Sequence, residues 1–161
     1  MAILGTLMVE LEEHKAYYDN GKLFEHYHHL NGKRHGECRI YYNNENLGIH
    51  SHYLNGERHG EYKSYQYDGK LEEYSYYLNG ERHGEYLLYY TDGQIYEHSH
   101  YLNDKLHGEY KLYHKDGKIR EHCYYINGID ITNEVNKEFN LSNLSEEDKL
   151  AIKLKWGISC L

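Results

Sequence analysis

The chain contains no proline, one tryptophan, two methionines and three cysteines in 161 residues. Without proline, no backbone donor is missing from a strand ladder. The cysteines, Cys38, Cys123 and Cys160, match neither a metal-ligand spacing nor an even disulfide set, which favours a reducing, cytoplasmic location. No apolar run approaches the roughly 18 residues of a membrane span, and residues 1–11 lack the basic start of a secretory signal.

Positive charge is also scarce. The chain has 18 Lys and Arg against 26 Asp and Glu, a net charge of −8 with neutral histidines, and it has no basic cluster. Because phosphate neutralisation supplies most of the affinity of nucleic-acid binding, we expect no nucleic-acid partner. Simple adhesion to anionic lipid is disfavoured too, because it requires clustered Lys and Arg.

What the chain does have is an internal repeat of fixed length. The decapeptide Tyr-Leu-Asn-Gly-Glu-Arg-His-Gly-Glu-Tyr occurs at 53–62 and again at 77–86. Four full units can be written, 17–40, 41–64, 65–88 and 89–112, followed by a partial unit at 113–130. A fixed period of this kind predicts a quasi-one-dimensional array, in which a recurring residue type serves the repeat.

Each unit is predicted to form one β-hairpin. Asn-Gly or Asp-Gly pairs occur twice in most units, and both pairs tolerate the positive φ of tight turns. The 21 tyrosines favour strands. We therefore expect a mainly β fold: an elongated, single-layer antiparallel β-meander of about ten strands built of 24-residue hairpin repeats, with a short C-terminal α-helical cap.

Three segments are expected. Residues 1–16 form an N-terminal capping half-repeat, with a capping strand within residues 1–11, and residues 17–130 form the repeat array. Residues 131–161 form a helical cap, because Ser145 and the acidic residues after it predict a helix start and Gly157 a stop. Docking of this helix on another protein is the alternative.

The array resembles the MORN repeat, whose usual unit reads Tyr-x-Gly-x-Trp-x-x-Gly-x-x-His-Gly-x-Gly. In the third unit Gly80, His83 and Gly84 match, whereas Glu73, Ser75, Tyr77 and Tyr86 depart from the pattern. The resemblance is closer to the variant repeat of bacterial antitoxin-like and large-virus repeat proteins, and it covers about 17–130. It implies scaffolding, often with dimerisation through an array end. The residues assigned to maintaining the repeat are Gly32, Gly56, Gly80, His35, Gly36, His59, Gly60, His83, Gly84, His107 and Gly108, with the histidines flanking turns.

Fourteen histidines raise a metal hypothesis, because His26/His28, His50/His52 and His98/His100 are His-x-His pairs. The same two positions hold Tyr74 and Tyr76 in the third unit, which favours an aromatic packing role. Equivalent columns are also about 10 Å apart, too far to share one ion. We therefore predict no metal site and no cofactor. Histidine protonation at acidic pH, which would switch on attachment to acidic surfaces, is a milder alternative.

Catalysis has little support. The recurring glutamates are expected to be solvated or to pair with Lys and Arg across strands, because a catalytic carboxylate acts at one site and not once per hairpin. No phosphate loop or nucleophile elbow occurs. The sequence therefore predicts a protein that is not an enzyme.

The predicted function is a repeat scaffold for protein–protein interaction or self-association, with a protein partner or a homo-oligomer. The candidate binding residues are a tyrosine column, Tyr53, Tyr77, Tyr101 and Tyr125. One alternative is phospholipid head-group binding peripheral to a membrane, through Arg34, Arg58 and Arg82 at one sheet edge, a row that Leu106 breaks. Another alternative is antitoxin-like binding of a cognate toxin.

Overall fold

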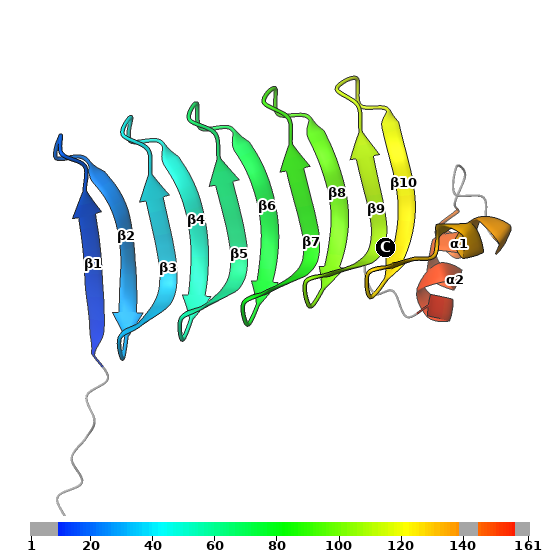
Figure 1. Cartoon of the computed structure of the whole chain (residues 1–161), viewed down its shortest axis with the longest axis horizontal. Coiled ribbons are helices and arrows are strands. Elements are labelled where there is room, and N and C mark those ends of the chain that lie inside the picture. The colour runs from blue at the N-terminus through cyan, green and yellow to red at the C-terminus, as the bar shows by residue number, and fades with distance from the viewer. Residues whose placement is uncertain (1–9, 139–144, 157–161) are drawn as a thin grey trace, which may run out of the picture.

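The repeats form one open sheet in the computed structural model, which describes residues 10–138 and 145–156 (Figure 1). Within them the sheet has 11 strands, and hydrogen-bonded neighbours follow one another in chain order. Every pair is antiparallel, so the predicted single-layer meander is confirmed. The strands are β1 (Leu11–Tyr17), β2 (Leu23–Leu30), β3 (Lys33–Tyr41), β4 (Leu47–Leu54), β5 (Glu57–Tyr65), β6 (Leu71–Leu78), β7 (Glu81–Tyr89), β8 (Ile95–Leu102), β9 (Lys105–Tyr113), β10 (Ile119–Ile126) and β11 (Ile129–Asp130).

The two-residue Asn-Gly turns close hairpins because both residues adopt left-handed backbone conformations, with φ of 52° at Asn31 and 73° at Gly32. From the second turn on, each turn is also bonded to the strand that follows the preceding turn. The Gly56 N–H donates to the Arg34 carbonyl, and the Gly80 N–H donates to the Arg58 carbonyl, both at 2.8 Å. The turns along this edge are therefore stacked, and the alignment of neighbouring hairpins is fixed there.

The turns at the other edge are longer and use side chains. The Oδ1 atoms of Asn20 and Asp68 accept the N–H two residues further on, at 3.1 and 3.2 Å, which is the geometry of an Asx turn. The residue that follows is a positive-φ glycine in four units, but in the second unit it is Glu45, with φ of 72°. The Tyr90 hydroxyl donates to the Tyr113 carbonyl of the next hairpin at 2.8 Å.

The His-Gly steps lie within strands, and each histidine is the third residue of a strand that begins directly after a turn. In the β4–β5 pair, Tyr53 lies opposite Arg58 and Ser51 lies opposite Tyr62, so three residues of β5 face one residue of β4. Gly60 has φ of 100° at this β-bulge. A Cβ there would make only ordinary contact, 3.6 Å from the nearest atom, so the backbone conformation selects glycine.

No second layer covers the described sheet, so its faces are covered by their own side chains. The most buried residues in the middle of one face are small, with Ser51, Ser75 and Ser99 at most 2% exposed. Ser99 lies opposite Tyr86 on β7 and Tyr110 on β9. A small residue between two tyrosines leaves space for their rings, so this face is stabilised by cross-strand packing.

Two helices lie at the β10 end of the sheet (Figure 1): α1 (Thr132–Glu138) and α2 (Glu146–Trp156). The α1 helix packs against β10, and Tyr124 and Val135 are fully buried. The helix predicted to begin near Ser145 is present, whereas α1 was not predicted. The expected stop at Gly157 and the expected capping strand lie largely outside the described residues, although β1 begins at Leu11. Neither helix is long and apolar enough, in its described residues, to cross a membrane.

Candidate functional site

The predicted arginines and tyrosines form one surface, which we call the arginine–tyrosine face. Arg58 lies with its guanidinium carbon 4.7 Å from the centre of the Tyr62 ring and 5.2 Å from that of Tyr77. Arg82 lies 4.1 Å from the centre of Tyr101. The face consists of Arg34, Arg58, Arg82, Tyr27, Tyr53, Tyr62, Tyr77, Tyr86, Tyr101, Tyr110 and Tyr125.

The cation–π contacts repeat from hairpin to hairpin. Arg34 stands between Tyr27 and Tyr53, at 4.3 and 5.6 Å from the two ring centres. Such contacts hold a guanidinium in place over the ring faces. Leu106 ends the row of arginines, and Tyr125 packs on the Tyr110 ring with the ring centres 5.8 Å apart. The arginine and tyrosine sets, which the sequence analysis assigned to alternative functions, are therefore in contact.

A second tyrosine column was missed by the sequence analysis. Tyr62, Tyr86 and Tyr110 each pack edge-to-face on the tyrosine of the following strand, with ring centres 5.6 to 5.9 Å apart. Burial raises the pKa of Tyr110 to about 12. The signal was present, because these tyrosines recur once in each unit, but the first unit has Cys38 in that position.

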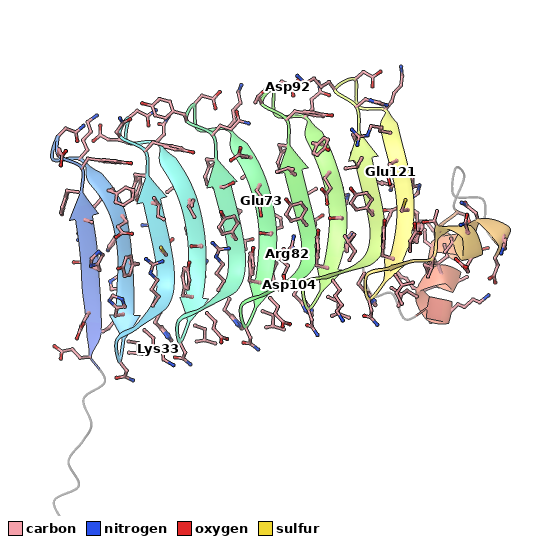
Figure 2. The ribbon with its side chains drawn as sticks, in the orientation of Figure 1. Lys33, Glu73, Arg82, Asp92, Asp104 and Glu121 are labelled. Atoms are coloured by element: carbon pink, nitrogen blue, oxygen red, sulfur yellow. The ribbon has the colours of Figure 1, made fainter. Side chains whose placement is uncertain are left out.

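The arginine row does not form a basic groove. Arg82 Nε lies 3.2 Å from Asp104 Oδ1, and Figure 2 shows these two residues side by side. Glu73 and Glu97 are carboxylates on the same face, and burial raises the pKa of each. Arg34 lies 3.9 Å from Glu25. Positive and negative groups therefore alternate on this surface.

The opposite side of the sheet, the histidine face, carries the His-x-His pairs. Successive strand residues point to opposite sides, so Tyr76 lies on this face and Tyr77 on the other. His26 Nε2 lies 2.9 Å from Glu13 Oε1, and His122 Nε2 lies 2.8 Å from Glu109 Oε1. The histidine face consists of His26, His28, His50, His52, Tyr74, Tyr76, His98, His100, His122 and Tyr124, with Glu13, Glu37, Glu61, Glu85 and Glu109 beside them.

Four of these glutamates, all but Glu85, also pair with Lys or Arg two residues further along the same strand, as in Lys63–Glu61 at 2.6 Å and Lys111–Glu109 at 2.7 Å. The sequence predicted Lys and Arg partners for these glutamates, but on neighbouring strands. It did not predict the histidine partners. Although burial by itself raises its pKa, hydrogen bonds from His122 and Lys111 hold the pKa of Glu109 at about 2.

A shallow depression occurs at the edge formed by the longer turns. It is lined by Gly93, Gln94, Ile95, Tyr113 and Gly117. The lining contains no carboxylate, imidazole or thiol, so it offers none of the common catalytic groups other than the Tyr113 phenol.

Comparison with protein-family models matches the MORN repeat variant at residues 13–31, 58–80, 82–103 and 106–127, more than half of the chain. The match begins in β1 and ends at Asn127, directly after β10, and it includes three of the four His-Gly steps. No curated protein sequence matches the chain.

Proposed function

Because the chain belongs to the family of variant MORN repeats, which are generally protein-binding or membrane-binding modules, we propose that it is a non-enzymatic scaffold that binds a protein partner. The proposed binding surface is the arginine–tyrosine face. The observation that carries the proposal is the row of partly exposed arginines, each held between tyrosine rings. Tyr and Arg are the residue types enriched at the energetic centres of protein interfaces.

The preorganisation of this face supports the proposal. Arg58 and Tyr77 are already in contact, so little side-chain freedom remains to be lost when a partner binds. The alternating carboxylates and guanidiniums also suit a polypeptide, which presents groups of both signs. A second copy of the chain or a toxin would each be a partner of this kind.

Two observations support a role without catalysis. The glutamates of the histidine face recur once per hairpin and each meets a histidine or a lysine, which is what a repeated structural contact produces. The depression at the longer turns is lined by no acid–base pair among the described residues. These observations favour binding over turnover.

Phospholipid head-group binding is the second candidate, and the arginine row is the feature that favours it. However, Asp104 forms an ion pair with Arg82, and the carboxylates of Glu25, Glu73 and Glu97 lie on the same face as the arginines. Anionic lipid attracts clusters of uncompensated Lys and Arg. The protein partner is therefore the better-supported proposal.

Site-specific photo-crosslinking tests the proposal with a control built into the chain. A photoreactive phenylalanine analogue replaces Tyr77 on the arginine–tyrosine face, or the adjacent Tyr76, which is 37% exposed on the histidine face. The variants are irradiated in cells of the source organism. We expect a discrete protein adduct from position 77 and not from 76, and we expect Arg58→Ala to diminish it.

Two further measurements separate the alternatives. Light scattering after size-exclusion chromatography, combined with the mass of the adduct, distinguishes a second copy of the chain from a different protein. Sedimentation with phosphatidylserine vesicles tests the lipid candidate. Binding to vesicles that is lost in the Arg34/Arg58/Arg82→Ala variant, with no protein adduct at position 77, would overturn the proposal.

A further inference from the structure

Two clusters on the histidine face contain the donor atoms of a metal site. One cluster is Glu13, His26 and His28, and the other is Glu37 with the next His-x-His pair, His50 and His52. In each cluster, one carboxylate oxygen and two imidazole nitrogens lie within 4.8 Å of one another. Among the described residues, these are the groups of three or more potential ligands that meet this condition.

The strand register assembles the three ligands. The two histidines of a pair are two residues apart on one strand, so they share a face, and the rings of His50 and His52 are 5.1 Å apart. The glutamate comes from the preceding strand, where Glu37 lies directly opposite His52. Its carboxylate reaches across to His50, with Oε1 2.5 Å from Nε2.

The first cluster is built in the same way, one repeat unit earlier in the chain. Glu13 on β1 lies opposite His28 on β2, and its Oε1 lies 2.9 Å from His26 Nε2. The rings of His26 and His28 are 5.3 Å apart. The same three residue types therefore take the same relative positions on two pairs of strands.

We propose that each cluster binds one divalent transition-metal ion, with Zn²⁺ as the expected class, through two imidazole nitrogens and one carboxylate oxygen. Imidazole and carboxylate are ordinary zinc ligands, with ligand bonds of about 2.0–2.2 Å. Binding requires side-chain rotations that bring the three donor atoms, now within 4.8 Å of one another, to these distances from one ion. Water completes the coordination, because the three ligands come from one side of a single-layer sheet.

The proposal answers both objections that the sequence raised. The third ligand comes from the adjoining strand, so each ion is held within one pair of strands and need not be shared between units. Tyr74 and Tyr76 occupy the same two positions in the third unit, so that unit has no metal site. Because tyrosine satisfies the packing at these positions, packing alone does not explain why other units have histidine there.

Solvent exposure and neighbouring cations determine how tightly each cluster is expected to bind an ion. The side chains of Glu37 and His50 are 38% and 21% exposed, so solvent reaches the cluster. The Glu37 carboxylate also lies 2.7 Å from Arg39, and the Glu13 carboxylate lies 2.6 Å from Lys15. A bound cation must compete with these groups or share the carboxylate with them, so we expect micromolar affinity.

The third His-x-His pair differs in its surroundings. His98 Nε2 lies 3.1 Å from Glu85 Oε1, without a hydrogen bond, but His100 directs Nδ1 toward the Glu109 carbonyl at 3.4 Å. Glu85, His98 and His100 are not among the groups of described residues whose ligand atoms lie within 4.8 Å of one another, so we expect two ions per chain. This pair serves as a matched control.

The experiment is titration calorimetry of the full, tag-free chain with ZnCl₂, together with visible spectroscopy of the Co²⁺-loaded protein. The variants copy the tyrosines that the chain already uses, which protects the fold: His26→Tyr/His28→Tyr, His50→Tyr/His52→Tyr, their combination, and His98→Tyr/His100→Tyr as the control. Circular dichroism checks that each variant is folded.

We expect two ions for the native chain, one for each double variant, none for the combination and two for the control. Glu37→Gln should weaken one of the two sites by about tenfold or more. The proposal is wrong if the combined variant binds Zn²⁺ as the native chain does, if the control loses an ion, or if native binding is weaker than millimolar. None of these outcomes depends on the protein partner proposed for the other face.

Discussion

Replacing Glu45 with glycine should stabilise the protein. Glu45 has φ of 72° at the turn position where four other units have glycine. A left-handed conformation costs a residue with a Cβ about 1–2 kcal/mol. Glycine removes that cost but adds about 0.4–1 kcal/mol of chain entropy to the unfolded state. The net gain is about 0.5–1 kcal/mol, or about 1–4 °C in Tm for a chain of this length.

Loss of the ion pair made by the Glu45 side chain offsets part of this gain. Its carboxylate lies 3.2 Å from Lys22 Nζ, and the Glu45 side chain is 68% exposed. Exposed ion pairs of this kind contribute about 0–1 kcal/mol. Glu45→Ala is the matched variant, because it removes the ion pair and keeps the Cβ. It should be no more stable than the native chain.

The reverse substitution completes the test. Gly93→Ala places a Cβ at φ of 89° with no atom within 4 Å, so any loss of stability comes from the backbone alone. We expect a loss of about 1 kcal/mol. Urea unfolding followed by circular dichroism measures all three variants. The reasoning fails if Glu45→Gly gives no gain over Glu45→Ala, or if Gly93→Ala is neutral.

Three other predictions concern the sheet. Tyr90→Phe removes the hydroxyl that donates a hydrogen bond to the Tyr113 carbonyl, and it should lower the free energy of unfolding in urea by about 1 kcal/mol. An unchanged unfolding midpoint would contradict this. Ser99→Leu overfills a position with no exposed surface and should lower the free energy of unfolding by about 1–3 kcal/mol, seen as a lower Tm, whereas Ser99→Ala should lower it less. Because the folded-state pKa of Glu109 is lowered from 4.5 to about 2, its stabilisation is fully present above pH 4.5 and is lost as pH falls toward 2. Unfolding midpoints of the native chain should therefore fall more steeply over this range than those of Glu109→Gln, and parallel curves would refute the assignment.

The period and the turn residues made much of the fold predictable. Asn31-Gly32 and its equivalents predict hairpins because few residue pairs adopt two left-handed conformations in succession. The meander follows, because short turns leave a strand no partner except its neighbour. The α1 helix was missed because its seven residues carry only a short pattern, with Val135 as the buried residue.

The candidate sites were less predictable, for a physical reason. Which residues face each other across strands depends on the bulge at the His-Gly step, and three residues there oppose one. That offset could not be derived from the spacing of glycines. As a result, the contact between Arg58 and Tyr77 and the position of Glu37 opposite His52 emerged only from the register of the sheet.

The hydrogen bonds between successive turns also bear on how such a chain can change length. The Gly56 N–H donates to the carbonyl of Arg34 in the preceding hairpin, and the Gly80 N–H donates to that of Arg58 in the same way, so successive units attach through equivalent backbone atoms. Gain or loss of a whole unit preserves every one of these bonds, whereas gain or loss of a single residue moves side chains to the wrong face. The identical decapeptides at 53–62 and 77–86 are what duplication of a whole unit would leave. The array is therefore a molecule whose reach can evolve in steps of one hairpin, about 10 Å, without redesign of its fold.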